Sequence, residues 1–587
     1  MYQNKRRSSP NETFTTDTKR SRTELNENNV PATCFENLSN ELFYEIFDYL
    51  GDDYIYETFS NLNYRFQHLI TCSSIPLKIK FRSTATSQSI DCCKTVVVPN
   101  RHRIRSLNFE HESLLNIFFK HCIIDSSFNR LQSIVLGNMS INRAAILLFY
   151  LKSLPNLVSL TMCIEEEEDS DLSDIYRMIF SLPSLKYNKL SLYVDYDEED
   201  LNISIPLALN AQFSTIEYMV MNHTCTLNNL MSILCHTPRV HHLICDTLQE
   251  ATESNVTNEQ SIILSNLVYI RINNCEINFD RFEMFMKKVS SQLQILHIKQ
   301  GANKAYLDAN RWQRLIKKYI PNLHKFIYEY PGYEYNDYET TSLDTTFNQF
   351  ISPFWVNKGW IFELEINNKE ISFSIHPHKK IWCDVDGNTD NALTRFIPTS
   401  QLSISGCWST KENQTFIDDF KSLFVAIQFT HLNINCEKVP IEMLIRIIQL
   451  LPNLNSLKIS SLPTMPLAWL FGINANTFFE TSTNNKIKKL HFVKIIDTEQ
   501  LSFLFSLCRY IEYFQVGCDK DMNLEILVKY ILIKTGICIP QLTCLCLNVE
   551  NCHEEMVHNL QKLIDNEKLL DIYTIKRMGD NIILKWN

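Results

Sequence analysis

A short apolar pattern, Leu-x-x-Leu-x-Leu, recurs along most of this 587-residue chain and restricts its fold more than any other feature. The middle apolar position recurs after 26 residues from Ile134 to Leu160 and after 27 from Leu243 to Ile270. Such alternation over a few residues predicts a strand, and the amphipathic stretches between the patterns, such as 281–289 and 441–449, predict helices. A strand and a helix repeated at a fixed interval predict a solenoid, in which each unit buries its apolar face against its neighbours.

The clearest unit, Leu267-x-x-Ile270-x-Ile272-x-x-Cys275, resembles the leucine-rich repeat even to its final Cys. The resemblance implies an α/β solenoid (a horseshoe) with parallel strands along its concave face and helices on the convex side. We expect these repeats over residues 73–330 and 401–587.

Residues 331–400 interrupt the period and contain three of the seven tryptophans, Trp355, Trp360 and Trp382. The pieces 360–366 and 371–375 predict a β-hairpin, with 381–385 as a candidate third strand. Two interpretations remain open for this insert. It is either a partner-binding insertion or a structural hairpin that extends the sheet.

Residues 34–72 predict a small module of three helices. Ser39 or Asn40 can cap a first helix that ends near Gly51, and a second begins after Asp53. The third covers 65–70. Three short helices enclose too small a core to be stable alone, so we expect their apolar surface to bind a neighbour or a partner. The apolar stripe expected on the first helix comprises Leu42, Ile46, Phe47 and Leu50.

In its order of residues this module resembles the F-box. The matching residues are Leu38, Glu41, Leu42, Ile46, Leu50, Asp53, Ile55, Phe59, Arg65 and Phe66. Ser39 and Phe66 stand where the family usually has Pro and often has Trp. The resemblance implies a non-catalytic substrate receptor of an SCF-type E3 ubiquitin ligase, which binds a Skp-type adaptor and through it a cullin scaffold. The adaptor-binding residues that it implies are Leu38, Leu42, Ile46, Phe47, Leu50, Ile55 and Phe59. The alternative is a ligase-independent interaction scaffold built on the repeats.

Composition limits the partners and the compartment. A net charge of −10 disfavours broad binding to the nucleic-acid backbone, and no apolar run approaches the roughly 18 residues that span a bilayer. The 19 cysteines are scattered without framework spacing, as expected of reduced thiols, so we expect a protein of the cytoplasm and/or nucleus.

Residues 1–33 are polar, and we expect them to be disordered. They hold two basic clusters, which are Lys5, Arg6 and Arg7, and then Lys19, Arg20 and Arg22. The two clusters resemble a bipartite nuclear-import signal, although a merely solubilising tail has the same composition.

No catalytic, cofactor or metal site is predicted. Phosphate-binding and acyl-transfer motifs are missing from the sequence, and His553 and His558 stand five residues apart rather than four. Cys544, Cys546, Cys552 and His553 are the set that could hold zinc, but two of them lie on a strand of alternating pattern, which disfavours such a site. The acidic runs 165–171 and 195–200 are interpreted as solvated turns before helices.

The residues that alternate with the apolar strand positions predict the composition of the exposed strand face. They are small and mostly neutral in the early repeats. Later they include Arg271, His297, Lys299 and Lys325, and beyond the insert Lys458, Lys489 and His491. We expect the first four to bind an acidic or phosphorylated segment of cargo. The alternative is that they pair with carboxylates on neighbouring strands.

Overall fold

The computed structural model describes residues 35–49, 58–59, 62–71, 76–81, 90, 92–165, 171–193, 203, 213–250, 265–289, 291–300, 303–334, 347–367, 370–377, 400–406, 412–463, 475–495, 497–519 and 522–586. The chain divides into two compact units, Met1–Ile79 and Lys80–Asn587. The polar tail with its six basic residues, most of the second helix of the predicted module, the candidate third strand at 381–385 and most of the two acidic runs lie outside the described residues.

The first unit contains η1 (Phe35–Asn37), α1 (Asn40–Tyr49) and α3 (Tyr64–Thr71), which confirms the first and third predicted helices. Its buried cluster is mostly aromatic and consists of Phe43, Phe47, Phe59, Phe66, Leu69 and Ile70. Of the stripe predicted on α1, Phe47 faces the core and Leu42 is exposed, and the core also contains Phe43, which the predicted stripe omitted. Phe43 and Phe47 are four residues apart and therefore lie on the same face of the helix.

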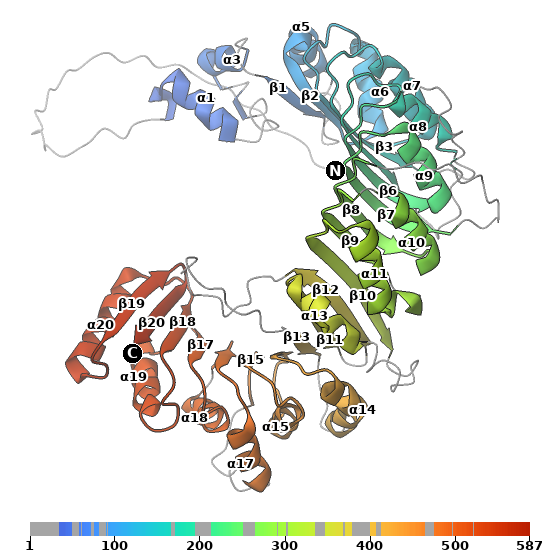
Figure 1. The fold of residues 1–587 in the computed structure, drawn as a ribbon. Coiled ribbons are helices and arrows are strands. Elements are labelled where there is room, and N and C mark those ends of the chain that lie inside the picture. The colour runs from blue at the N-terminus through green and yellow to red at the C-terminus, as the bar shows by residue number, and fades with distance from the viewer. Residues whose placement is uncertain are drawn as a thin grey trace, which may run out of the picture. The chain divides into compact units, whose positions relative to one another are not determined.

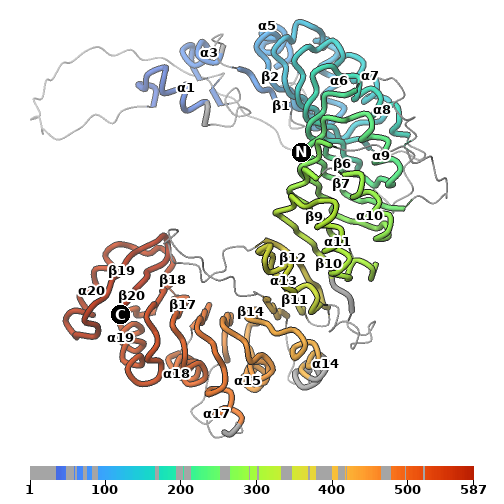
Figure 2. The backbone as a smooth tube through the Cα atoms, in the orientation of Figure 1, coloured from blue at the N-terminus to red at the C-terminus, as the bar shows by residue number. Residues whose placement is uncertain are grey.

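The second unit is an α/β repeat structure built on one long sheet, and Figure 2 follows its chain alternately through strands and helices. In the described ranges the sheet has 20 strands, most of them parallel. Its strands up to the hairpin are β1 (Leu77–Phe81), β2 (Ile104–Phe109), β3 (Ser133–Met139), β4 (Ser159–Glu165), β5 (Tyr187–Tyr193), β6 (Tyr218–Thr226), β7 (His242–Gln249), β8 (Tyr269–Cys275), β9 (Ile295–Lys299) and β10 (Lys325–Glu334). Those that follow are β11 (Trp360–Asn367), β12 (Glu370–Pro377), β13 (Ser400–Ser405), β14 (His431–Asn435), β15 (Ser456–Ile459), β16 (Lys489–Phe492), β17 (Tyr513–Cys518), β18 (Cys544–Val549), β19 (Tyr573–Met578) and β20 (Asn581–Trp586).

Helices connect these strands and lie along one face of the sheet, leaving the other face uncovered by described helices (Figure 1). The longer ones before the hairpin are α6 (Glu112–His121), α7 (Ile141–Leu151), α8 (Ser173–Phe180), α9 (Leu227–His236), α10 (Phe279–Lys288) and α11 (Ala309–Tyr319). Those after it are α14 (Glu412–Ala426), α15 (Ile441–Leu450), α17 (Ala475–Asn484), α18 (Thr498–Leu507), α19 (Leu524–Thr535) and α20 (Glu554–Glu567). The shorter helical segments are η2 (Cys93–Val97), α5 (Val98–Asn100), η3 (Arg101–Arg103), η4 (Lys304–Leu307), η6 (Gln349–Ile351) and α13 (Pro353–Asn357). Within the described residues, no helix is both long and apolar enough to cross a membrane.

The core lies between the sheet and its helices. Apolar residues stand in register on successive strands, as Leu243, Ile270 and Leu296 do, and all three are fully buried. Several helices begin at a side-chain cap, for example Asn278, whose Oδ1 accepts from the backbone N–H of Arg281. The period of the sequence therefore predicted both the strand positions and the helices α10 and α15.

The predicted hairpin is confirmed and is continuous with the sheet. β11 and β12 pair antiparallel, β12 pairs antiparallel with β10, and β11 pairs parallel with β13. Trp355 and Trp360 are buried against Phe326, with centroids 5.9 and 5.4 Å from it. For these residues the structural interpretation therefore holds, in which the hairpin extends the sheet. Trp382 lies outside the described residues.

The sheet ends differently from the expected parallel order. β20 pairs antiparallel with both β18 and β19, so it lies between them. Antiparallel neighbours need only a tight turn, and here Gly579, at φ +63°, supplies it between β19 and β20. The outer strand β19 carries the charged residues Lys576 and Arg577, which discourage pairing with a further strand.

Candidate interaction surfaces

Arg65 on α3 fixes the start of α1 in the first unit. Its guanidinium donates to the carbonyl oxygens of Glu36 and Leu38, the second at 2.6 Å, and from Nη2 to Asn40 Oδ1 at 2.8 Å. It also lies over the ring of Phe43, 5.3 Å from the centroid. A planar group with five donors can satisfy several acceptors at once, which a lysine cannot do in this geometry.

Apolar side chains remain exposed around this aromatic core. Leu42 is 44 % exposed and Tyr64 is 85 % exposed, and Phe35 and Leu62 are exposed as well. Phe35 nevertheless packs on the core rings, 5.1 Å from Phe43 between centroids. Exposed apolar residues concentrated on so small a unit are typical of a surface that a partner covers.

The predicted adaptor-binding residues fall into four groups. Leu42 is exposed, whereas Leu38 and Ile46 are half-buried at the edge of the aromatic core. Phe47 and Phe59 are buried inside it, where they hold the helices together. Leu50 and Ile55 lie outside the described residues.

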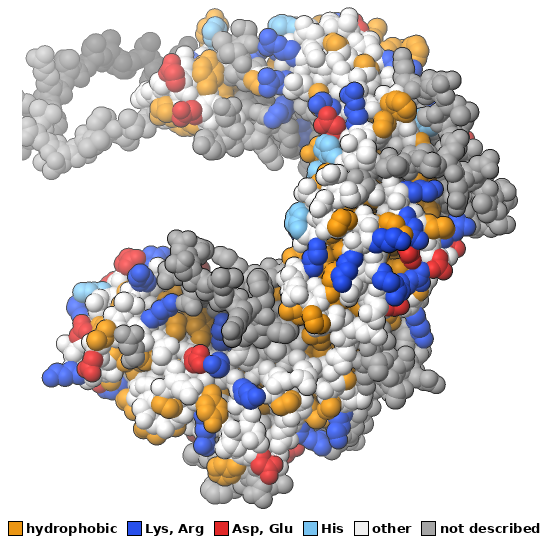
Figure 3. Space-filling view, in the orientation of Figure 1, with side chains coloured by type: hydrophobic (Ala, Val, Ile, Leu, Met, Phe, Trp, Pro, Cys, Tyr) orange, Lys and Arg blue, Asp and Glu red, His pale blue; other side chains and the backbone are white. Residues whose placement is uncertain are grey.

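The second candidate surface is the uncovered face of the sheet in the second unit. Along β7 to β10 the buried positions alternate with exposed or half-buried ones, so the predicted cargo residues stand on this face. Arg271 and His297 are in register on neighbouring strands, and Lys299 is in register with Glu329. Figure 3 shows Lys and Arg side chains gathered over the part of this unit that includes β8–β10 and α10–α11.

The four predicted cargo residues are not equivalent. His297 is paired, because its Nε2 lies 3.1 Å from Glu329 Oε1, and for this residue the alternative of cross-strand pairing holds. This hydrogen bond lowers the pKa of Glu329, and Lys299 and Arg271 add to the effect. Arg271, Lys299 and Lys325 are exposed and form no ion pair within the described part of the chain.

A groove of about 820 Å³ adjoins these residues, between β9, β10, β12 and β11. Its lining includes Lys299, Lys325, Glu329, Glu363, Phe373 and His376. Glu363 is held by the imidazole of His376 at 3.0 Å and by donors from Gln401 and Ser403 at 2.7 and 3.0 Å. This arrangement was not predicted, because the hairpin brings β12 beside β10 from a distant part of the sequence.

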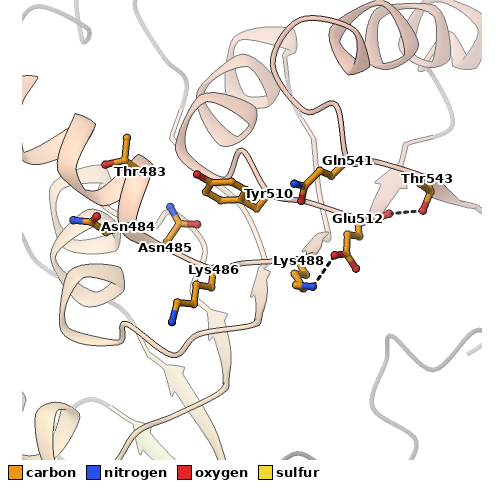
Figure 4. Close-up of a pocket in the computed structure, with 9 residues that line it drawn as sticks. All are labelled: Thr483, Asn484, Asn485, Lys486, Lys488, Tyr510, Glu512, Gln541 and Thr543. Atoms are coloured by element: carbon orange, nitrogen blue, oxygen red, sulfur yellow. Dashed lines mark hydrogen bonds and ion pairs between the residues drawn. The ribbon is translucent and has the colours of Figure 1, made fainter. Parts of the chain in front are cut away.

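A second, polar depression of about 880 Å³ lies near the starts of β16, β17 and β18. Figure 4 shows its lining residues, which come from the loops before these strands and from the end of α17. Lys488 and Glu512 form an ion pair there, at 2.7 Å between Nζ and Oε1. The remaining lining groups are mainly hydroxyls and amides, and they bring together no reactive set.

The candidate metal residues do not assemble into a site. The described part of the chain holds no group of three His, Cys, Asp or Glu side chains placed to bind one ion. Burial raises the pKa of the Cys245, Cys275 and Cys518 thiols to about 12, so these cysteines stay protonated at neutral pH.

Neither the known family models nor the curated proteins contain a match to this chain.

Proposed function

We propose that the chain is the substrate-recognition subunit of an SCF-type E3 ubiquitin ligase, built from an F-box and leucine-rich repeats. The F-box binds a Skp-type adaptor, the adaptor links it to a cullin scaffold, and the repeat surface binds the protein to be modified. On this proposal the chain itself performs no chemistry and works in the cytoplasm or nucleus.

The observation that supports this proposal best is the exposed rim of the first unit, by which we mean the exposed apolar residues Phe35, Leu42, Leu62 and Tyr64. An aromatic core joined by Arg65 leaves Leu42 at its surface, at a position that matches an apolar residue of the F-box pattern. The long repeat sheet then supplies a second surface on the same chain, as a receptor with separate adaptor and cargo sites requires.

Affinity capture of the full chain tests the proposal, with adaptor and cullin quantified by mass spectrometry. Leu42→Asp places a charge on the exposed rim without disturbing the core, and we expect it to reduce both proteins at least about tenfold. Ile526→Asp is the control, because Ile526 on α19 of the second unit is also an exposed apolar residue, 63 % exposed against 44 % for Leu42.

Each outcome separates the hypotheses. Loss of adaptor and cullin in Leu42→Asp, with normal capture in Ile526→Asp, supports the ligase receptor. Capture of adaptor without cullin supports the ligase-independent scaffold instead. Capture of neither protein by the unmutated chain contradicts the proposal.

A further inference from the structure

Three ring side chains form a stacked row on the uncovered face of the sheet. Tyr218, His242 and Tyr269 are in register on β6, β7 and β8. Their centroids are 4.5 Å and 5.3 Å apart, with interplanar angles of 28° and 16°. Residues next to them in sequence, such as Leu243, are buried, so the ring row points away from the core.

The row leads into the basic residues described above. Lys325 is in register with Ile295, and Ile295 with Tyr269, so Lys325 extends the ring row two strands further. Arg271 stands two residues after Tyr269 and therefore on the same face. Its Nε donates to the neutral amide oxygen of Asn273 at 2.7 Å, and Arg271 forms no ion pair in the described residues.

Three carboxylates on or beside this face already have donors. Glu329 is bound by His297, Glu363 by His376, and Asp246 accepts from Asn273 at 2.8 Å. The three cations Arg271, Lys299 and Lys325, here called the cation set, form no ion pair in the described residues, although the charges of Arg271 and Lys299 help to lower the pKa of Glu329. Around β8 to β10 these three cationic groups are therefore available for direct contact with an anionic ligand.

The packing of the rings favours a peptide over a nucleic acid. Both faces of His242 are covered, by Tyr218 and by Tyr269, so the central ring has no free face on which a base could stack. The outward groups are ring edges, which carry partial positive charge, and polar atoms that can hydrogen-bond. These groups attract carboxylate, phosphate and backbone carbonyl oxygens.

We propose that the face formed by β6–β10 binds an extended acidic segment of a protein, with its anionic side chains on the cation set and its backbone across the ring row. Identifying this segment as cargo rests on the proposed ligase function. The anionic groups are aspartate, glutamate or phosphorylated side chains, which share the chemistry that the cation set recognises.

The test uses purified full chain and a short fluorescent peptide of alternating glutamate and alanine. Its glutamine counterpart, its phosphoserine counterpart and an oligothymidylate of equal length are measured beside it. Replacing the cation set by Arg271→Gln, Lys299→Gln and Lys325→Gln should weaken glutamate-peptide binding about tenfold. The same variant should keep the adaptor, which separates failure of this inference from failure of the ligase proposal.

The matched control removes the same residue types from the helical side of the same repeat. Arg314→Gln, Lys317→Gln and Lys318→Gln on α11 change the net charge equally and should leave affinity unchanged. Tighter binding of the phosphoserine peptide identifies phosphate as the preferred anion and supports the inference. Equal affinity in both triple variants overturns it, and so does tighter binding of the oligothymidylate than of either acidic peptide.

Discussion

Gly517 on β17 shows how closely neighbouring repeats approach. A Cβ atom at this position would lie 1.9 Å from the backbone carbonyl oxygen of Val493, a contact that only backbone movement can relieve. We expect Gly517→Ala to lower the free energy of unfolding by about 2 kcal/mol or more. Gly536→Ala is the control, because its nearest neighbouring atom would be 3.9 Å away. Equal denaturation midpoints for the two variants would contradict this account of the packing.

His491 on β16 should make stability depend on pH. Burial, together with the charge of Lys458, lowers the pKa of His491 to about 4, whereas an unfolded histidine titrates near ~6.5. Below that unfolded value the unfolded chain binds the proton more readily, so stability falls as the pH drops from about 6.5 towards 4. Thermal unfolding at neutral and mildly acidic pH should show a smaller difference in His491→Gln. An identical difference in both proteins would refute the assignment.

Contacts of individual side chains were the least predictable part of the structure. Glu41, Leu42 and Arg65 were recognised by their order, but Phe43 was not identified as core, although its i, i+4 spacing to Phe47 was a usable signal. The pairing of His297 with Glu329 depends on strand register, and spacing along one strand does not reveal it. The stacked row of Tyr218, His242 and Tyr269 was missed for the same reason.

Among the elements, α1 and α3 of the first unit are joined by the hydrogen bonds of Arg65 as well as by their shared aromatic core. Arg65 donates to Leu38 and Asn40 before and at the start of α1 and covers Phe43. Arg65→Lys keeps the charge but loses the planar set of donors, and we expect a cost of about 1–3 kcal/mol to this unit. Hydrogen exchange should become faster in the amides of α1 and α3, while those of α10 stay unchanged. Unaltered exchange in α1 would show that Arg65 is dispensable.

The repeating elements were predictable because each strand and helix buries a face at a fixed interval of the sequence. β8, β9, α10 and α15 lie where the apolar period placed them. The two places where strands run antiparallel were not predictable in full. The hairpin could be predicted from the pattern around Trp360. Its position between β10 and β13 depends on long-range strand pairing, which the local pattern does not indicate.

At the scale of the whole molecule, one chain combines a small helical unit with an exposed apolar rim and a long repeat sheet with one uncovered face. The first unit is too small to enclose a stable core without a partner. The sheet of the second unit is long enough to make several contacts with a ligand. Because the two surfaces are built from different units of the chain, substitutions on the sheet, such as those in the cation set, are expected to leave adaptor binding intact.

The proposed ligase function is tested most directly by calorimetric titration of the purified full chain with a purified Skp-type adaptor. Light scattering then measures the mass of the product. We expect a one-to-one complex, and an affinity at least about tenfold weaker for Leu42→Asp than for Ile526→Asp. A folded full chain that shows neither heat of binding nor a mass increase with the adaptor would contradict the proposal that it is a ligase substrate receptor.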